Sequence, residues 1–411
     1  MLSVNFFVNN RKKLLNSIED NSALLLFSGK PKQKSADQDY PFTVDRNFYY
    51  ETGINEANDV LLISKINGKV EEILFIAEID ELKARWVGKT LSKQEATSLS
   101  GIINVKFIAE FNNILEDKLK YVNKLYLDLE GQDFNNLCLY NPFYNYLKNN
   151  YKSIKIVDCY HNIAEHRMIK EDEEIELIKH AIGITKKGIE SLMKNAKSGI
   201  YEYQLEAFFD FEIKRLGAND FAFKTIAGSG INGAILHYED NNSIIEKGTL
   251  ILFDLGAQYQ LYNSDITRTF PVDGKFSERQ KQIYNIVLKG QDLVISNVRP
   301  GVTLMDLNNI LIDYYVDELT KIKLIKNRDE LKKYYFHGVS HHLGLDTHDI
   351  SIRSKPLKKG AVITVEPGLY IEEESIGIRI ENDVLVTDDG CIDLASDIIK
   401  TVEDIEEFMK K

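Results

Sequence analysis

Segments 246–256, EKGTLILFDLG, and 358–368, KKGAVITVEPG, decide the fold, because they are two copies of one pattern. Each copy begins with a Lys-Gly turn and continues as an apolar run that is typical of a buried strand. The run reaches a carboxylate in both copies, Asp254 in the first and Glu366 in the second. Matched positions of this kind indicate an internal repeat.

A second pair of segments matches in the same order along the chain. Residues 197–209, KSGIYEYQLEAFF, resemble residues 299–311, RPGVTLMDLNNIL, with glycine, an aliphatic residue and leucine at matching offsets. Each segment follows one predicted helix and opens another. We therefore predict two related halves, and if an approximate two-fold axis relates them, Asp254 and Glu366 face each other across it.

The chain outside this repeat predicts a separate first domain. A length of 411 residues, 44% of them hydrophobic, suggests two cores. Up to about residue 165, short β-rich runs alternate with helical stretches, which is typical of an α/β domain. Residues 166–193 then predict a long helix with acids in its first turn. We place the boundary before this helix and predict domains 1–165 and 166–411. The β-rich runs are 59–66, 71–79, 124–131 and 153–159.

Composition excludes several classes of partner. Lys and Arg number 51 against 63 Asp and Glu, a net charge of −12, and no dense basic block predicts a nucleic-acid or membrane surface. The start of the chain does not resemble a secretory signal, and no apolar run is long enough to span a bilayer. Three widely spaced cysteines, Cys138, Cys159 and Cys391, are typical of reduced thiols. These features together predict a cytoplasmic protein.

Four acids stand in strongly apolar strand contexts. Asp265 lies in a β-rich stretch that can pair as a hairpin with the strand of Asp254, and Glu381 shares one face of a predicted strand with Arg379. For any single acid, a turn cap at the end of a strand is the alternative. Four carboxylates that converge would repel unless they are protonated or bind metal, and two divalent ions balance their charge.

Histidines add nitrogen to this oxygen set. Residues 337–348, HGVSHHLGLDTH, hold four of the eight histidines. The neighbours His341 and His342 cannot face the same side of an extended segment. Carboxylates with one imidazole suit Mn, Fe, Co or Zn better than Ca or Mg. Two such ions that share a water would make the site a hydrolase.

Four motifs follow one another in the second half: FDLGAQYQLYNSDITRTFP (253–271), HGVSHHLGLDTHD (337–349), TVEPGLYI (364–371) and GIRIEND (377–383). They resemble those of the pita-bread metallopeptidases, and among them of aminopeptidase P and prolidase. The resemblance implies an α/β amino-terminal domain followed by a pita-bread catalytic domain with an internal pseudo-two-fold repeat. Residues 45–54, DRNFYYETGI, are similar to the amino-terminal domain that these enzymes carry.

The resemblance implies two divalent metal ions, usually manganese, with cobalt, iron or zinc as alternatives. Asp254 would hold one ion and His341 with Glu366 the other, while Asp265 and Glu381 would bridge the two. An aromatic or aliphatic residue stands at the position of His342 in many relatives, so its side chain is expected to point away from the metals.

The resemblance also implies a set of residues around the substrate. His237 would hold the substrate and its reaction intermediate, His337 would line the site, and His348 would lie near the proline. Arg379 would orient either an acidic ligand or the substrate. Glu366 would shuttle the proton. Tyr370 matches a tyrosine beside the metals, with an aromatic core residue as the alternative.

The implied reaction is hydrolysis of the peptide bond between an amino-terminal residue and a following proline, with a proline-containing peptide as substrate. Ser340 before the ligand histidine favours an Xaa-Pro aminopeptidase over the alternative, a prolidase that cleaves Xaa-Pro dipeptides. A second alternative is a binding protein of this fold that has lost activity. The resemblance further implies a homodimer or homotetramer, in which Trp86 either contributes to the interface or packs in a core.

Overall fold

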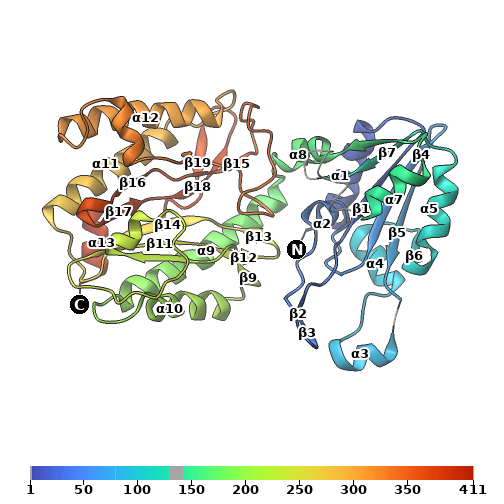
Figure 1. The fold of residues 1–411 in the computed structure, drawn as a ribbon, viewed down its shortest axis with the longest axis horizontal. Helices are drawn as coiled ribbons and strands as arrows, with labels where there is room; N and C mark the ends of the chain where they lie inside the picture. Colours follow the sequence, from blue (N-terminus) through green and yellow to red (C-terminus); the bar gives the residue numbers. More distant parts are fainter. Residues whose placement is uncertain (1, 79, 130–141, 411) are drawn as a thin grey trace. The chain divides into compact units, whose positions relative to one another are not determined.

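The computed structural model describes residues 2–78, 80–129 and 142–410. The chain divides into two compact units, Leu2–His166 and Arg167–Lys411 (Figure 1). Each unit contains helices and strands, so the predicted α/β class is confirmed. Cys138 and the ends of the predicted β-rich runs at residues 79 and 130–131 lie outside the described residues.

The amino-terminal unit is built on one mixed sheet of six strands in the order β6-β5-β4-β1-β7-β8. Strand β1 pairs antiparallel with β4 and parallel with β7, and β7 pairs parallel with β8. The helices are α1 (Val4–Ser17), α2 (Arg46–Thr52), α3 (Glu81–Val87), α4 (Lys93–Ser100), α5 (Phe111–Leu119), α7 (Pro142–Asn150) and α8 (Tyr160–Arg167), with the 3₁₀ turn η1 (Ile108–Glu110). The strands are β1 (Ser22–Phe27), β2 (Gln33–Ser35), β3 (Gln38–Asp39), β4 (Val60–Ile66), β5 (Lys69–Ile76), β6 (Val105–Phe107), β7 (Lys124–Leu127) and β8 (Lys155–Asp158).

One hydrophobic cluster of this unit lies against one face of the sheet, where Leu62, Phe75 and Leu125 pack with the apolar side of α5. The alternate residues of the strands, such as Leu61 and Leu74, are also fully buried. Trp86 is not part of this core. The indole sits on α3 with 85% of its surface exposed, so the core alternative for this tryptophan is wrong.

The carboxy-terminal unit holds several short sheets between two pairs of helices. Its helices are α9 (Asp172–Asn195), α10 (Glu202–Arg215), α11 (Glu278–Ile295), α12 (Leu304–Lys321) and α13 (Val402–Phe408), with 3₁₀ turns η2 (Gly230–Ala234), η3 (Arg328–Lys333) and η4 (Glu372–Glu374). Its strands are β9 (Asp220–Phe221), β10 (Ile226–Ser229), β11 (Leu250–Leu255), β12 (Ala257–Tyr259), β13 (Tyr262–Asn263), β14 (Ile266–Pro271), β15 (Val362–Val365), β16 (Gly368–Ile371), β17 (Ile376–Arg379), β18 (Asn382–Val386) and β19 (Cys391–Asp393).

The internal repeat is visible in the backbone. Gly199 and Gly301, at matched positions before α10 and α12, have φ values of 86° and 90°. Gly248 and Gly360, in the two Lys-Gly turns, have φ values of 77° and 87°. Such values favour glycine, because a Cβ atom strains this backbone conformation. The predicted relation between the two halves is confirmed at both turns.

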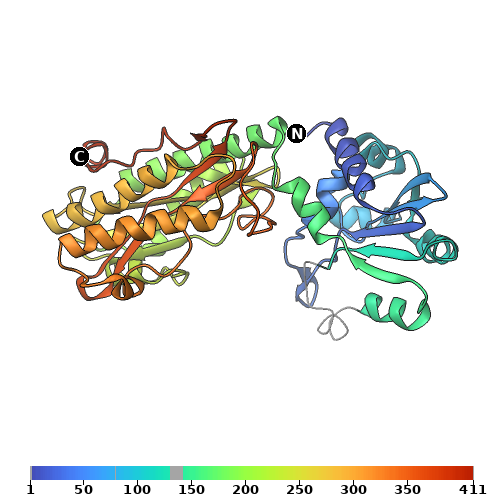
Figure 2. The ribbon, with the colours of Figure 1, turned by 90° about the horizontal axis from the view of Figure 1, so that it is seen from above.

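The two helix pairs enclose the strands. In Figure 1, α9 and α10 run along one side of the strands of this unit, and α11 and α12 along the other. Figure 2 shows α11 and α12 side by side. Strand β11 pairs antiparallel with β14, and β15 pairs antiparallel with β18, so each repeated strand has an antiparallel partner. Over the described ranges, no helix combines the length and apolar character that crossing a membrane requires.

Candidate active site

The repeated strands deliver the predicted acids to one place. Asp254 lies in β11 opposite Thr267 of β14, and Asp265 immediately precedes β14. The hairpin predicted for these two acids is therefore confirmed. In the second copy, Glu366 follows β15 and Glu381 stands between β17 and β18. The strand pairing thus brings both copies' carboxylates into the middle of the unit.

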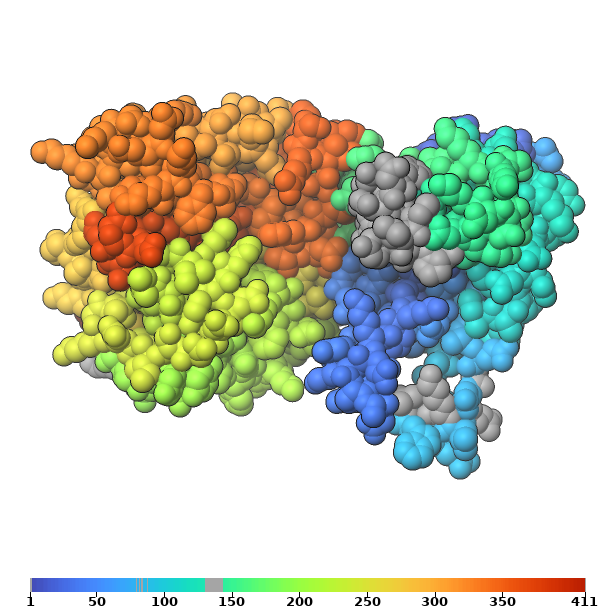
Figure 3. Space-filling view, in the orientation of Figure 1, coloured from blue at the N-terminus to red at the C-terminus, as the bar shows by residue number. Residues whose placement is uncertain are grey.

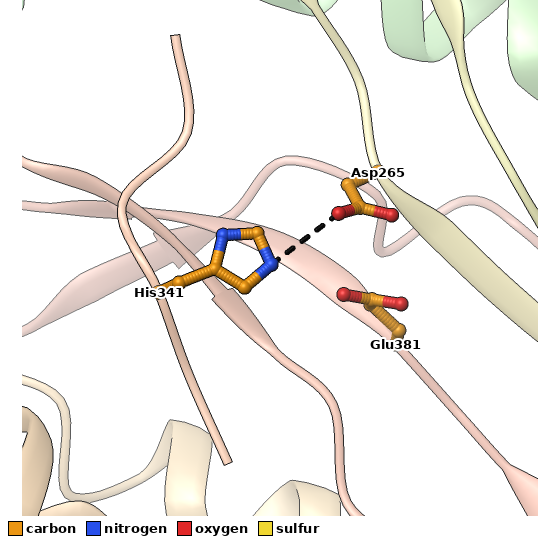
Figure 4. Close-up of side chains that lie close together, drawn as sticks. All are labelled: Asp265, His341 and Glu381. Atoms are coloured by element: carbon orange, nitrogen blue, oxygen red, sulfur yellow. Dashed lines mark ion pairs between the residues drawn. The ribbon is translucent and has the colours of Figure 1, made fainter. Parts of the chain in front are cut away.

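Asp265, His341 and Glu381 form a tight group (Figure 4). One ligand atom from each lies within 4.8 Å of the others. The Nε2 atom of His341 is 3.4 Å from Asp265 Oδ2 and also 3.4 Å from Glu366 Oε1. One histidine therefore stands among three acids, Asp265, Glu366 and Glu381, each of which lies beside a different strand end.

The fourth acid, Asp254, is held by an arginine. Arg379, 2% exposed, donates from Nη2 to Asp254 Oδ2 over 2.6 Å and from Nε to Thr267 Oγ1 over 3.2 Å. A buried guanidinium requires such partners. The sequence left two roles open for Arg379, to orient an acidic ligand or to orient the substrate. Among the described residues, Arg379 bonds to an acid, Asp254.

The donor set suits a cation. Asp254 Oδ1 and Asp265 Oδ1 are buried and have no hydrogen-bond partner among the described residues. An unpaired buried carboxylate oxygen costs free energy unless a cation or a proton satisfies it. The carboxylates and one imidazole are ligands that Mn, Fe, Co and Zn accept. The residues present therefore fit divalent metal ions.

The pKa values of the cluster in the absence of metal also indicate that it requires positive charge. Burial raises the pKa of Glu366 to about 7 and that of Asp265 to about 6, and it raises the pKa of Glu381 well above its ordinary value. Burial alone would lower the pKa of His341, but its hydrogen bond with Asp265 and the charge of Glu366 raise it to about 9. Without metal, protons therefore supply the positive charge that this cluster of acids requires.

The two neighbouring histidines face opposite sides. The segment around them pairs with β15 like a strand, since Thr364 N donates to His341 O and Leu343 N to Val362 O. Side chains alternate along such a segment. His342 is 2% exposed, and its surroundings include Lys170 and Asp349 rather than the acids of the cluster. The expectation that His342 points away from the metal ligands is confirmed.

His337 takes part in a chain of hydrogen bonds. Arg379 Nη1 donates to the Tyr370 hydroxyl over 2.8 Å, which in turn lies 2.9 Å from His337 Nε2. His337 Nδ1 lies 2.7 Å from Gly338 O. Burial and the charge of Arg379 lower the pKa of His337 to about 4, so the ring is neutral and can donate from Nδ1 while it accepts at Nε2. Tyr370 is thus both buried and bonded to the site.

The other two histidines lie on the exposed side of the site. The ring of His348 is 4.2 Å from that of His341, and burial lowers its pKa to about 4. His237 is exposed, and its charge contributes to the lowered pKa of both His337 and His348. His337 and His341 therefore lie against the carboxylates, His348 packs on His341, and His237 lies close enough to influence the pKa of His337 and of His348.

Two residues at the site were not predicted from the sequence. Thr267 Oγ1 donates to Glu381 Oε2 over 2.6 Å, and Asp383 Oδ2 accepts from the backbone N of Asp265 over 3.1 Å. Burial raises the pKa of Asp383 well above its ordinary value. Each lies two residues after a predicted acid, so the alternation of a strand places it on the same face. This two-residue spacing is the sequence signal that could have identified Thr267 and Asp383.

Known proteins resemble the chain over its whole length. Residues 176–388 match the profile of Metallopeptidase family M24, and residues 7–126 match the profile "Aminopeptidase P, N-terminal domain". The Xaa-Pro aminopeptidase of Escherichia coli is 32% identical, with 98% of this chain and 97% of that protein covered.

Solved structures agree in fold. A structure described as an aminopeptidase P from Bacillus anthracis superposes with a TM-score of 0.95 at 46% identity, covering 99% of this chain and 98% of the other. The Escherichia coli aminopeptidase P with the inhibitor Pro-Leu gives a TM-score of 0.90 at 33% identity, with the same coverage.

Proposed function

Because the chain belongs to metallopeptidase family M24, we propose that it is an Xaa-Pro aminopeptidase, which hydrolyses the peptide bond between an amino-terminal residue and a following proline. The observation that carries this proposal is the group of Asp265, His341 and Glu381 beside Glu366. The match to an Xaa-Pro aminopeptidase over 98% of the chain supports the choice of substrate.

As a member of this family, the chain binds divalent metal ions. We propose that Asp254, Asp265, His341, Glu366 and Glu381 would hold two divalent ions, with manganese as the first candidate. The unpaired oxygens of Asp254 and Asp265 support this assignment. Two bound ions would lower the pKa of a shared water and polarise the substrate carbonyl.

The chain's own residues would bind, orient and exchange protons. His237 would donate a hydrogen bond to the carbonyl oxygen as its negative charge develops. Glu366 would accept a proton at its carboxylate and deliver it to the leaving proline nitrogen. Arg379 would fix Asp254 through its hydrogen bond of 2.6 Å. His337 and His348 would line the substrate space, His348 near the proline ring.

Proline specificity follows from the substrate's shape. A proline amide has no N–H, and its ring fixes the local backbone. A site fitted to this ring therefore discriminates against ordinary peptides.

We also propose that the amino-terminal domain ends at residue 165, that the protein is cytoplasmic, and that it assembles as a homodimer or homotetramer. The free thiols of Cys159 and Cys391 support a reducing compartment. Leu82 and Trp86, which are 71% and 85% exposed on α3, support a surface that another subunit covers.

Incubation of metal-free protein with an Xaa-Pro-Yaa tripeptide or an Xaa-Pro dipeptide, each with and without Mn²⁺, tests the activity. We expect metal-dependent release of the first residue from the tripeptide, measured by chromatography. Cleavage of the dipeptide alone would identify a prolidase. Cleavage of neither peptide with any metal would contradict a peptidase and favour a binding protein.

A further inference from the structure

His237 stands on a segment with little regular structure. Between β10 and β11 the chain forms only the 3₁₀ turn η2, and His237 follows this turn with its side chain exposed. A side chain on such a segment needs support from elsewhere to hold one geometry. Contacts with other elements must therefore hold the backbone and the side chains around His237.

Glu202, the first residue of α10, is fully buried and accepts five hydrogen bonds, three from this segment and two from Ser229, the last residue of β10. Its Oε1 accepts from the Ser229 backbone N and Oγ, both over 2.7 Å, and from Asn232 Nδ2 over 3.1 Å. Its Oε2 accepts from the Tyr238 hydroxyl over 2.8 Å and from the Ser243 backbone N over 3.0 Å. One carboxylate thus joins residues on both sides of His237.

The charge of Glu202 makes these bonds strong. Among the described residues no lysine or arginine forms an ion pair with it, so the segment's donors and the amino end of α10 stabilise the charge. A buried carboxylate is costly without such partners. The dependence is mutual, because the buried donors of the segment lose their acceptor if Glu202 is replaced.

A separate set of contacts joins Asn241 of the segment to β10, to the residue before β10 and to α10. Asn241 accepts at Oδ1 from Ala227 N over 2.9 Å and donates from Nδ2 to Thr225 O and to Glu206 Oε2, also over 2.9 Å. It does not reach the residues next to His237. Of Glu202 and Glu206, which both lie on α10 and both bond to side chains around this segment, only Glu202 bonds to Tyr238, the neighbour of His237.

On the basis of the proposed function, we propose that Glu202 is a positioning residue for the reaction: its carboxylate fixes the segment that presents His237 to the substrate. Glu202 faces away from solvent and acts through Tyr238 and the backbone around it. Its role is to hold one placement of the imidazole before the substrate binds.

Glu202→Gln tests the proposal, with Glu206→Gln as the matched control on the same helix. A glutamine at 202 keeps the size but turns one acceptor into a donor, so it opposes either Ser229 N or Ser243 N. Misplacement of a catalytic group by about 1 Å costs up to about 100-fold in rate. We expect kcat for the tripeptide to fall by about 10-fold to 100-fold with little change in KM, and Glu206→Gln to retain wild-type kcat.

A double-mutant cycle with His237→Ala separates positioning from general damage. We expect Glu202→Gln to cause no further loss of kcat when His237 is already alanine. An equal loss in both backgrounds would overturn the proposal. If Glu202→Gln does not fold, Tyr238→Phe, which removes one donor to Oε2, takes its place in the cycle, with a smaller loss expected and additivity again overturning the proposal.

A readout without substrate keeps this test distinct from that of the proposed function. In protein with ¹³C-labelled histidine, the His237 ring resonance, assigned by its loss in His237→Ala, should shift or broaden in Glu202→Gln but not in Glu206→Gln. An unchanged resonance in Glu202→Gln would overturn the positioning role. Failure of the wild type to cleave either peptide would overturn the proposed function and, with it, the kinetic role of Glu202.

Discussion

His341 and His342 are adjacent, yet they stand in different chemical surroundings. His341 Nε2 lies 3.4 Å from both Asp265 and Glu366. His342 is buried on the other side, and its Nδ1 has no hydrogen-bond partner in the described part of the chain. Both residues are histidines, so residue type does not distinguish them. The direction in which each side chain points does.

His341→Ala should lose bound metal and lower kcat at least about 100-fold, because loss of a residue that only hydrogen-bonds to a metal ligand already lowers metal affinity or activity by about 10-fold to 100-fold. His342→Phe is the matched control. The ring stays close in size and loses no bond at Nδ1, so we expect metal content and activity near the wild type. Metal analysis and tripeptide cleavage check both variants. Loss of metal in His342→Phe with retention in His341→Ala would reverse the assignment.

At the scale of elements, η2 and β17 cross at two glycines. A Cβ atom on Gly377 would lie 1.8 Å from the Gly233 carbonyl oxygen, so the two backbones touch. In Figure 3 the yellow-green surface, which has the colour of η2, borders the red surface, which has the colour of β17. This crossing places the segment of His237 beside the strand of Arg379.

Gly377→Ala should push η2 away from β17. Overpacking of a close contact costs about 1 to 3 kcal/mol of stability, and the displaced segment should also lower kcat. Gly390→Ala is the control, because no atom lies within 4 Å of the Cβ position there. Denaturant unfolding and tripeptide cleavage measure the two effects. If Gly377→Ala and Gly390→Ala have the same stability and the same kcat, the close contact between η2 and β17 is contradicted.

At the scale of the whole molecule, each unit has its own buried acids. Glu51, on α2 of the amino-terminal unit, is 0% exposed, and neither carboxylate oxygen has a hydrogen-bond partner among the described residues. Burial raises the pKa of Glu51 from 4.5 to about 8, an effect that Arg11 opposes and Glu72 strengthens. Folding of this unit therefore takes up a proton at neutral pH.

The sign of the pH effect follows from this proton uptake. Below pH 4.5 Glu51 is protonated in both states, and between pH 4.5 and about 8 only the unfolded state loses its proton, so stability falls as pH rises. At pH 8 the loss is on the order of 4 kcal/mol. We expect Glu51→Gln to match the wild type near pH 5 and to be more stable at pH 8, measured by denaturant unfolding of the full chain.

The control is Glu116→Gln, an exposed acid of the same unit, which should keep the wild-type pH dependence. Burial raises the pKa of Asp59 to about 7, so Asp59 should contribute a part of the decrease in stability with pH that remains in every variant. A slope that is the same in Glu51→Gln and the wild type would contradict the role of Glu51.

The sequence by itself determined the features that local pattern encodes. The repeated Lys-Gly turns and strands predicted two halves, and the acids at matched positions predicted that Asp254 and Glu366 face each other. Strand alternation predicted that His341 and His342 face apart. These features depend on spacing along one chain segment, and spacing is fully visible in the sequence.

Only the tertiary structure decided which distant residues complete the site. Glu202 lies 35 residues before His237 and supports it through donors that no local pattern marks. Gly233 meets Gly377 from the other half, and Glu51 is buried although its sequence context on α2 does not indicate it. The physical reason is that hydrogen bonding, close packing and burial depend on contacts between segments, which form only when the chain is folded.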